Sequence, residues 1–591
     1  MRKNKESGNN ADSPKSPGAL ILFGPAVLAA LLFGWSARGG AHARYLFATT
    51  SYYIIFAMVF CWAWVVAAWL KKEEFSFPGF IRRHRIGLAA ALLLSVAVVL
   101  SMKPDFQVLS DETNLLAVSK SMVHDRSVLN QTMGRFYFGN FYPVESEAVV
   151  EKRPLLFPFV VHFFHLALGY GARSAFLANF VILCALFSGV YALARRQLDE
   201  PSSIAAMLLM ASYPIVSISA ASAGYDLLAL LFLFIAMVSL YGFMKQPHDH
   251  ARFALLWMNL VMLANVRHES LMFLPLAAGG AWLMGYVPRE TARRNMPLFG
   301  ATLLFMAPLT WQKLLSAGAY ENPPGVPLFG FSHFVEHAGI MLKAQADFGF
   351  AYPFNAAANL AAFGSLAWFC LLLLKRKISL ASWQLHFAAL ALLLLAAANT
   401  VSLSHFFGVY THPTQARLFL AFAAACALAP VLLKSIRPAA YGTYGLLVLA
   451  IATFIPCHAS AVTGRFMNTS NLPRESRHCF QFLERQGERH VMVISDRPGQ
   501  YAALDYGAVS YGYANGNPSM LKMELRRHLF REIYVFQRIS YATNEPVPET
   551  SLSETFHLAA LYEIQITANE FLRISRVAPD ESPAPEPATN H

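Results

Sequence analysis

Apolar stretches of the length needed to cross a lipid bilayer recur along most of this chain. The sequence contains about thirteen of them, because a helix crosses a hydrocarbon core of roughly 30 Å in about 20 residues. They lie at 18–36, 45–69, 86–102, 173–194, 201–219, 224–244, 253–266, 269–286, 296–315, 356–374, 383–403, 413–433 and 441–458. With 56% hydrophobic and 14% charged residues, the chain is far more apolar than soluble domains. An all-α polytopic membrane domain is therefore predicted.

Lysine and arginine gather in alternate connections between these stretches, for example at 71–85, 289–294 and 375–377. Because cytoplasmic loops carry an excess of positive residues, these connections and the N-terminus are placed in the cytoplasm. The connections at 103–172, 317–355 and 404–412 and the tail after about 459 then face outward. The net charge of +12 is explained by this topology, so no nucleic-acid partner is predicted. Residues 1–17 are expected to form a disordered cytoplasmic lead.

The tail changes composition sharply and regains charge. Strand patterns at 491–495 and 532–537 alternate with helix patterns at 477–486, 499–505 and 520–529, and segments 556–566 and 571–577 are expected to close a sheet. A small outward-facing α/β domain is predicted over 459–578, followed by a disordered end at 579–591.

The predicted topology places Cys457 and Cys479 on the outer side. The sequence allows two alternatives for them, a disulfide or two free thiols.

Acidic residues stand at the outer ends of two spans. Asp111 and Glu112 open a helix in the long loop 103–172, with Ser110 as the expected N-cap. Asp226 lies at the entrance of the span that starts near 224. Such acids can simply complement a helix dipole. They can equally mark chemistry, since ionisable groups at membrane depth are costly and usually functional.

Cations accompany these acids on the outer side. Lys152 and Arg153 precede a short apolar stretch at 155–168, which is predicted to be an interfacial helix. The remaining candidates are Arg173 at the start of a span, the turn Arg267-His268-Glu269, and Tyr410, His412 and Arg417 before the span at 413–433. The turn residues can contact a phosphate or simply pair with one another, and the last group can be an ordinary interfacial belt. Together they predict an outward cavity rimmed by carboxylates and cations.

Such a cavity suits transfer of a sugar from a lipid phosphate. The phosphate is already a competent leaving group, so the protein needs cations to stabilise it and a carboxylate to take a proton from the acceptor. Arginine fits phosphate because its planar fork makes two charge-assisted hydrogen bonds at once. Arg153, Arg267 and Arg417 are therefore the first candidates for the phosphate ligands.

The order of these motifs resembles that of the polytopic glycosyltransferases of the C superfamily, which include protein O-mannosyltransferases and lipid A aminoarabinose transferases. The resemblance covers about residues 86–458. It rests on five motifs in order: Asp111-Glu112 after the third span, Lys152-Arg153-Pro154-Leu155, Gly171-Ala172-Arg173, Ala223-Gly224-Tyr225-Asp226-Leu227-Leu228, and the turn 265–269.

The resemblance implies an inverting transfer from a polyprenyl-phosphate sugar on the periplasmic face of a bacterial inner membrane. Asp111 is then expected to be the general base, with Glu112 as its acidic neighbour and Asp226 as the second cavity acid. Lys152 or Arg153 would bind the phosphate. The acceptor could be a glycan, a lipid or a protein, and the family pattern leaves open whether a divalent cation takes part.

Two features depart from the family pattern. Relatives commonly show Lys-Pro-Pro where this chain has Lys152-Arg153-Pro154, which leaves open which cation takes the phosphate. Two additional spans, within 18–85, precede the family-like region. The rival interpretation is a transporter or a flippase for lipid-linked glycans. Against it, the sequence shows no internal repeat, and its ionisable residues concentrate at the outer face rather than at mid-span.

Overall fold

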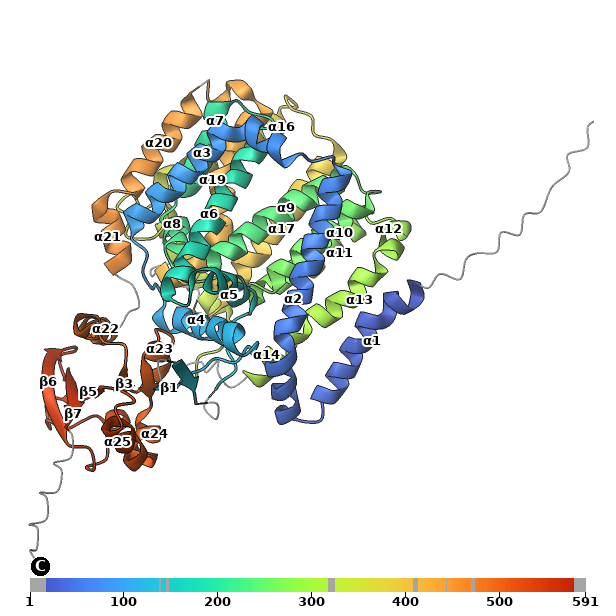
Figure 1. The fold of residues 1–591 in the computed structure, drawn as a ribbon. Coiled ribbons are helices and arrows are strands. Elements are labelled where there is room, and N and C mark those ends of the chain that lie inside the picture. The colour runs from blue at the N-terminus through green and yellow to red at the C-terminus, as the bar shows by residue number, and fades with distance from the viewer. Residues whose placement is uncertain are drawn as a thin grey trace, which may run out of the picture.

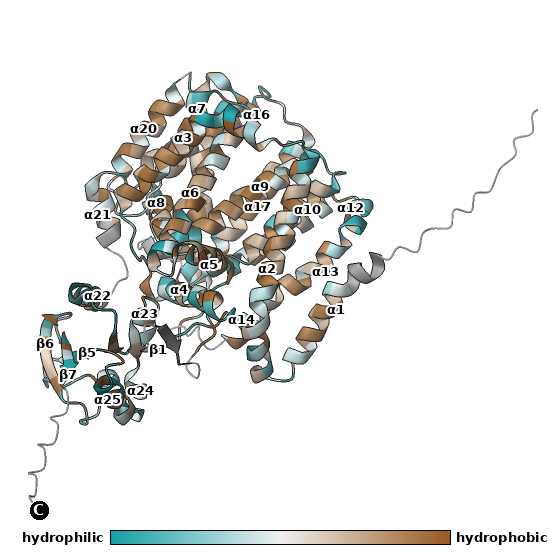
Figure 2. Cartoon of the chain, viewed as in Figure 1, coloured by the Kyte–Doolittle hydropathy of each residue, from teal (hydrophilic) through white to brown (hydrophobic). Residues whose placement is uncertain are grey.

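The chain folds into a helical bundle with a small α/β unit at one end (Figure 1). The structure is a computed structural model, and it describes residues 18–137, 140–144, 148–316, 325–407, 413–442, 444–468 and 474–578. Figure 2 shows apolar residues along the bundle helices and hydrophilic residues gathered in the connections and in the α/β unit. This distribution is that of a multi-pass membrane protein, which confirms the predicted fold class.

Eight helices in the described part of the chain are long and apolar enough to cross a membrane. They are α2 (Gly40–Lys72), α3 (Phe77–Met102), α6 (Ala172–Ala194), α9 (Asp226–Lys245), α13 with α14 (Met296–Leu315), α16 (Ala356–Leu374), α17 (Ser382–Ser404) and η4 with α19 (Arg417–Ile436). A ninth is the pair α7 (Glu200–Ala211) and α8 (Pro214–Ala220), which is bent by 79°. The bend falls before Pro214, where the preceding Tyr213 is extended because a following proline disfavours helical backbone.

The other apolar stretches form shorter helices. Three of the expected spans become α10 (His250–Ala264), α11 (Phe273–Leu283) and α20 (Gly445–Cys457), with 15, 11 and 13 residues. The described part of the chain therefore contains eight or nine helices that are long and apolar enough to cross a membrane, fewer than the thirteen spans predicted from the sequence. The remaining helical segments of the bundle are α1 (Gly18–Ser36), α12 (Arg289–Arg294), α13 (Met296–Phe305), α14 (Ala307–Leu315), α15 (Phe331–Gln345), α18 (Pro413–Ala416), η4 (Arg417–Phe419), α19 (Leu420–Ile436), η5 (Pro438–Ala440) and α21 (Ser460–Asn468).

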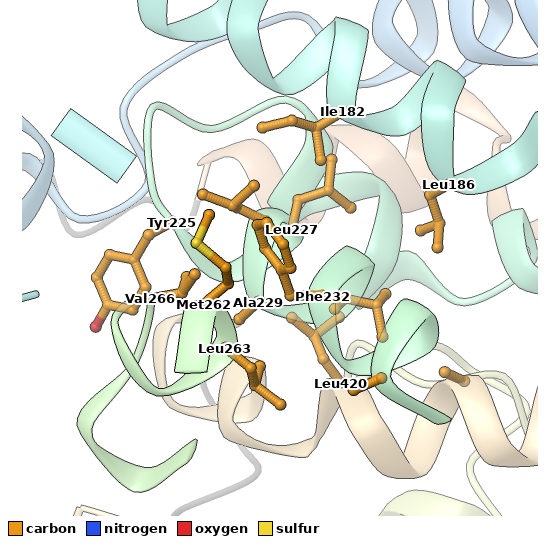
Figure 3. Packing of buried hydrophobic residues seen from close by; sticks show 14 of the residues in the cluster. Ile182, Leu186, Tyr225, Leu227, Ala229, Phe232, Met262, Leu263, Val266 and Leu420 are labelled. Atoms are coloured by element: carbon orange, nitrogen blue, oxygen red, sulfur yellow. The ribbon is translucent and has the colours of Figure 1, made fainter. Parts of the chain in front are cut away.

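A continuous apolar core holds the inner helices together. Figure 3 shows part of it, with Phe232 of α9 near the middle of a cluster that also holds Ile182 and Leu186 of α6, Leu263 of α10 and Leu420 of α19. Helix α9 contacts each of these three helices. These side chains are almost fully buried. Because a close-packed core transmits strain rather than absorbing it, the ends of these helices are held at fixed positions.

The long connection between α3 and α6, which the sequence analysis predicts to be an outer loop, supplies two helices that lie across the end of the bundle, α4 (Leu109–His124) and α5 (Leu156–Leu168) (Figure 1). The helix expected at 155–168 is thus present. The prediction that Ser110 is the N-cap of α4 is wrong. The N-cap is Val108, whose side chain makes no capping hydrogen bond. Instead Glu112 reaches back and accepts the Val108 N–H at 3.2 Å, as an acid in the first turn can do.

The C-terminal part forms a seven-stranded mixed sheet with the order β2-β1-β4-β3-β5-β7-β6. Its own strands are β3 (Val491–Ile494), β4 (Gly507–Val509), β5 (Glu532–Ser540), β6 (Leu558–Gln565) and β7 (Glu570–Val577), and its helices are α22 (Arg474–Gln486), α23 (Pro498–Ala502), α24 (Tyr511–Gly516), α25 (Pro518–Arg526) and η6 (Pro548–Thr550). The predicted strands and helices are present, whereas β4 and α24 were not expected. Cys457 and Cys479 are both buried free thiols.

Two strands of this sheet come from the outer loop. β1 (Gly134–Tyr137) and β2 (Asn140–Pro143) form an antiparallel pair, and Gly134 of β1 pairs with Ala508 of β4. This hairpin was not predicted, because nothing in the local pattern of either segment indicates a partner so far away in the chain. Its place in the sheet puts the outer loop and the C-terminal unit at the same end of the bundle.

Candidate active site

Two aspartates and three arginines form a buried cluster at the end of the bundle that carries α4 and α5. Asp111 lies in the first turn of α4 and Asp226 is the first residue of α9. Arg153 lies in the segment before α5, Arg267 is the N-cap of η2 (His268–Met272), and Arg417 opens η4. Five segments that are distant in the sequence therefore bring their charges to one place.

Arg417 links the two aspartates. Its Nη2 donates to Asp111 Oδ2 at 2.8 Å, and its Nη1 donates to Asp226 Oδ2 at 3.4 Å. The other oxygen of each aspartate has its own arginine: Arg153 Nη2 donates to Asp111 Oδ1, and Arg267 Nη1 donates to Asp226 Oδ1 at 2.9 Å. The result is a continuous alternation of positive and negative groups, in which both oxygens of each aspartate are engaged.

Further groups hold the arginines in place. Arg153 Nη1 donates to Glu151 Oε1 at 2.5 Å, and Gln312 of α14 donates to the carbonyl oxygens of both residues at 2.6 Å. The ring of Tyr225 lies 5.7 Å from the Arg267 guanidinium and 5.9 Å from that of Arg417, a cation–π arrangement. Sequence reasoning missed Glu151, Gln312 and Tyr225. The acid two residues before Arg153 and the tyrosine beside Asp226 were the available signals.

The environment of Asp111 favours its charged form. Burial raises the pKa of this carboxyl, but the ion pairs with Arg153 and Arg417 outweigh burial, so the pKa lies below its ordinary value. Asp111 is therefore a carboxylate at neutral pH. While both of its oxygens accept from arginines, its basicity is low.

Glu112 points away from the arginines and toward backbone amides. Its carboxyl accepts the N–H groups of Gln107 and Val108 at 3.2 Å and of Ala223 at 3.0 Å. From the other side, Asn179 of α6 donates to the carbonyl oxygens of Ser222 and Gly224 at 2.7 and 2.9 Å. The turn that leads to Asp226 is thus held from both sides, and Glu112 joins it to the start of α4.

Burial raises the pKa of Glu112 to about 8, and the backbone N–H groups that it accepts lower the pKa without cancelling the effect of burial. Two adjacent acids thus differ in kind: Asp111 is held charged by arginines, whereas Glu112 takes up a proton close to neutral pH.

The other predicted residues lie around this cluster. His268 Nε2 contacts the Lys152 carbonyl oxygen at 2.8 Å, and burial lowers the pKa of His268 to about 4. Glu269, with 47% of its side chain exposed, accepts from Arg267 Nε at 3.4 Å. Arg173 is exposed in the first turn of α6, and no described contact joins it to the cluster. Tyr410 and His412 lie outside the described residues.

A cleft of about 520 Å³, including its open mouth, begins at the cluster. One end is polar and is lined by Asp226, Arg267, Glu269, Ser270 and Arg417. The walls are apolar and come from α9, α10, α11, α17 and α19, with Leu230, Leu233, Leu263, Phe273 and Leu420 among the lining residues. The cleft therefore combines charged and apolar lining residues.

The described residues contain no group of three or more His, Cys, Asp and Glu side chains placed to hold a metal ion. Asp111 and Asp226, the acids that the sequence suggested for a divalent cation, face arginines in this structure.

Neither a protein-family model nor a curated protein sequence matches this chain.

Solved structures with a similar fold include two of ArnT from Cupriavidus metallidurans. The one in the apo state is 13% identical, with 83% of this chain and 97% of that chain covered and a TM-score of 0.41. The same protein bound to undecaprenyl phosphate is 14% identical, with 84% and 98% covered and a TM-score of 0.41. At these identities the reaction has to be inferred from the side chains of the site.

Proposed function

We propose that this protein is a membrane glycosyltransferase that moves a sugar from a polyprenyl-phosphate donor to an acceptor on the periplasmic face of a bacterial inner membrane, with inversion. The observation that carries the proposal is a largely buried cluster of three arginines and two aspartates. Three of its members, Asp226, Arg267 and Arg417, line an amphipathic cleft. The N-terminus is then cytoplasmic, and the α/β unit is periplasmic.

The cleft provides for both parts of such a donor. Its apolar walls suit an isoprenoid chain, since leucine and phenylalanine side chains gain by being covered. Its polar end presents Arg267 and Arg417, whose forked guanidinium groups match the oxygens of a phosphate. Arg153 pairs with the other oxygen of Asp111 and adds a third cation beside the proposed base.

Donor binding would activate the base. Asp111 has no oxygen free for a proton while Arg153 and Arg417 are both paired with it. A phosphate that draws one of these arginines to itself releases an oxygen of Asp111 and removes a positive neighbour, which raises the pKa of this carboxyl toward its ordinary value. The base is therefore weak in the empty site and stronger when the donor is present.

The reaction then needs one displacement. The acceptor hydroxyl or amine attacks the anomeric carbon, and its proton passes to Asp111. The bond from that carbon to the phosphate oxygen breaks, and its electron pair leaves on the polyprenyl phosphate. The arginines stabilise the charge that develops there. A single displacement inverts the configuration at the anomeric carbon. Asp226 holds Arg267 and Arg417 in position throughout.

The test is transfer of radiolabelled sugar from a panel of polyprenyl-phosphate sugars to an acceptor pool from membrane extract. Asp111→Asn should fold and lose transfer by about 10²–10⁴-fold, because an amide cannot take the proton. Asp249→Asn, at the other end of the bundle, is the matched control, since Asp249 caps α10 and asparagine caps about equally well. If folded wild-type protein consumes none of the donors, the enzyme proposal fails and a transporter or flippase takes its place.

A further inference from the structure

The segment that joins Asp111 to Arg153 passes through the sheet of the C-terminal unit. Its strand β1 pairs with β4 through Gly134 and Ala508. Met133, just before β1, is buried in the apolar core of that unit with Ile494 and Val509. The backbone N–H of Ser510 also donates to the Met133 sulfur at 3.1 Å. The C-terminal unit is therefore continuous with the loop that carries the candidate site.

The helix α4 is itself docked on this unit. Lys120 Nζ forms an ion pair with Asp505 and lies 3.4 Å from the carbonyl oxygen of Ala502. Tyr170, in the turn between α5 and α6, donates its hydroxyl to the carbonyl oxygen of Ala503. The Lys120 ammonium lies 4.8 Å from the centre of the Tyr170 ring. Two side chains of the membrane domain thus contact three residues at the end of α23 and just after it, namely Ala502, Ala503 and Asp505.

On α4, Lys120, which contacts the C-terminal unit, and Asp111, the proposed base, lie on opposite faces. Lys120 follows Asp111 by nine residues, which on a helix of 3.6 residues per turn places it about 13 Å further along and on the opposite face. Most of α4 is buried, and only 6% of the Lys120 side chain is exposed. The helix is therefore held between the arginine cluster on one side and the C-terminal unit on the other, so a shift at one face moves the other.

We propose that Lys120, Tyr170 and Asp505 are positioning residues, which fix α4 on the C-terminal unit so that Asp111 stands between Arg153 and Arg417. The role in transfer rests on the proposed function, whereas the docking itself does not. The α/β unit is then part of the catalytic arrangement: its segment 502–505 sets the distance between the base and the phosphate ligands.

The experiment compares Lys120→Met and Asp505→Asn with Glu563→Gln in the full-length protein. Glu563 pairs with Arg573 between β6 and β7 of the same unit and is half-exposed, so its loss controls for a general effect of removing an ion pair there. Both docking variants should lower kcat by about 10–100-fold, since a misplacement of about 1 Å costs that much. The KM for the donor should stay within about twofold, because the arginines remain. Lys120→Arg should restore most of kcat, since it keeps the charge.

Hydrogen exchange provides a readout that does not depend on activity. The amides of 109–124 should exchange faster in Lys120→Met and Asp505→Asn than in the wild type, and at the wild-type rate in Glu563→Gln. Unchanged exchange in α4, or wild-type kcat with faster exchange, would overturn the positioning role. If the wild type transfers no sugar but α4 loosens in both variants, the docking stands and the proposed function fails.

Discussion

The two ends of α9 carry ion-pair clusters of very different character. At its N-terminal end, Asp226 pairs with Arg267 and Arg417, and only 4% of the Asp226 side chain is exposed. Beyond its C-terminal end, Asp249 pairs with Lys72 and with Arg252. Here 53% of the Lys72 side chain is exposed, against 19% for Arg252 and 11% for Asp249, so this cluster reaches the solvent mainly through Lys72. Exposed pairs contribute little to stability. Buried charges are costly to desolvate, so a buried cluster that persists points to a use other than stability.

The largest effect is expected when the bridging cation of the buried cluster is removed. Arg417→Met leaves Asp111 and Asp226 with one arginine each in a buried site. Breaking a buried pair typically costs about 3–5 kcal/mol, so thermal unfolding in detergent should occur at a markedly lower temperature. Transfer should also be lost. Arg252→Met, which breaks the pairs with Asp249 and Glu73 at the opposite end, should cost less, because Asp249 keeps Lys72 as a partner and this cluster is in contact with solvent. Equal effects of the two variants would remove the distinction between the ends.

The second effect separates the two aspartates of the cluster. Asp226→Asn should raise the KM for the donor by about tenfold with a smaller change in kcat, because in the proposed mechanism Asp226 positions Arg267 and Arg417 for the phosphate without taking the proton. Asp111→Asn should do the reverse, with a large fall in kcat. Steady-state kinetics with a purified polyprenyl-phosphate sugar measures both constants, and a fall in kcat alone for Asp226→Asn would assign the base to Asp226 instead.

The third effect concerns the dependence of stability on pH. The pKa of Glu112 is about 8 in the folded protein against an ordinary value of 4.5, so between these values the folded state holds a proton that the unfolded state has lost. Stability then falls as pH rises through this window and levels off above about pH 8. Glu112→Gln should flatten that slope in melting curves recorded between pH 5 and pH 9. A slope that is as steep in the variant as in the wild type would assign it to another group.

The smallest effect is expected at the exposed end. Lys72→Met should change the free energy of unfolding by less than about 1 kcal/mol at low ionic strength. The difference should vanish in 1 M salt, where the Debye length falls to about 3 Å. Urea or thermal unfolding of both proteins at 0.1 M and 1 M NaCl tests this. The effect of Arg417→Met should be nearly the same at both salt concentrations, because water and ions are kept from the buried pair.

Local patterns in the sequence were enough for the bundle helices, for the helix at 155–168 and for most strands of the C-terminal unit, because hydrophobic period and charge asymmetry act over a few turns. They also supplied Asp111, Asp226, Arg153, Arg267 and Arg417 as candidates. Which of these pair with one another depends on contacts across the whole bundle. No local signal says that Arg417 joins two aspartates that come from α4 and α9.

Long-range pairing also explains what sequence reasoning missed. The β1 hairpin reads as part of a loop, because its partner strand β4 has only three residues and lies near the other end of the chain. From the sequence, Glu112 is predicted to share a site with Asp111, because the two acids are adjacent at the start of a helix. In the fold its carboxyl turns to the Ala223 amide, a contact that depends on how α4 meets the α8–α9 turn.

Because β1 and β2 complete the sheet of the C-terminal unit, this sheet can form only late in synthesis. A ribosome adds about 5–20 residues per second, so tens of seconds separate the emergence of β1 from that of β4. In the proposed orientation, the loop with Asp111 and Arg153 has by then crossed the membrane, while the strand that completes its sheet has not been made. A chain truncated before β4 would therefore carry the proposed reactive groups across the membrane without assembling them. On the proposed function, transfer activity then reports that the polypeptide has been translated and translocated at least as far as this strand.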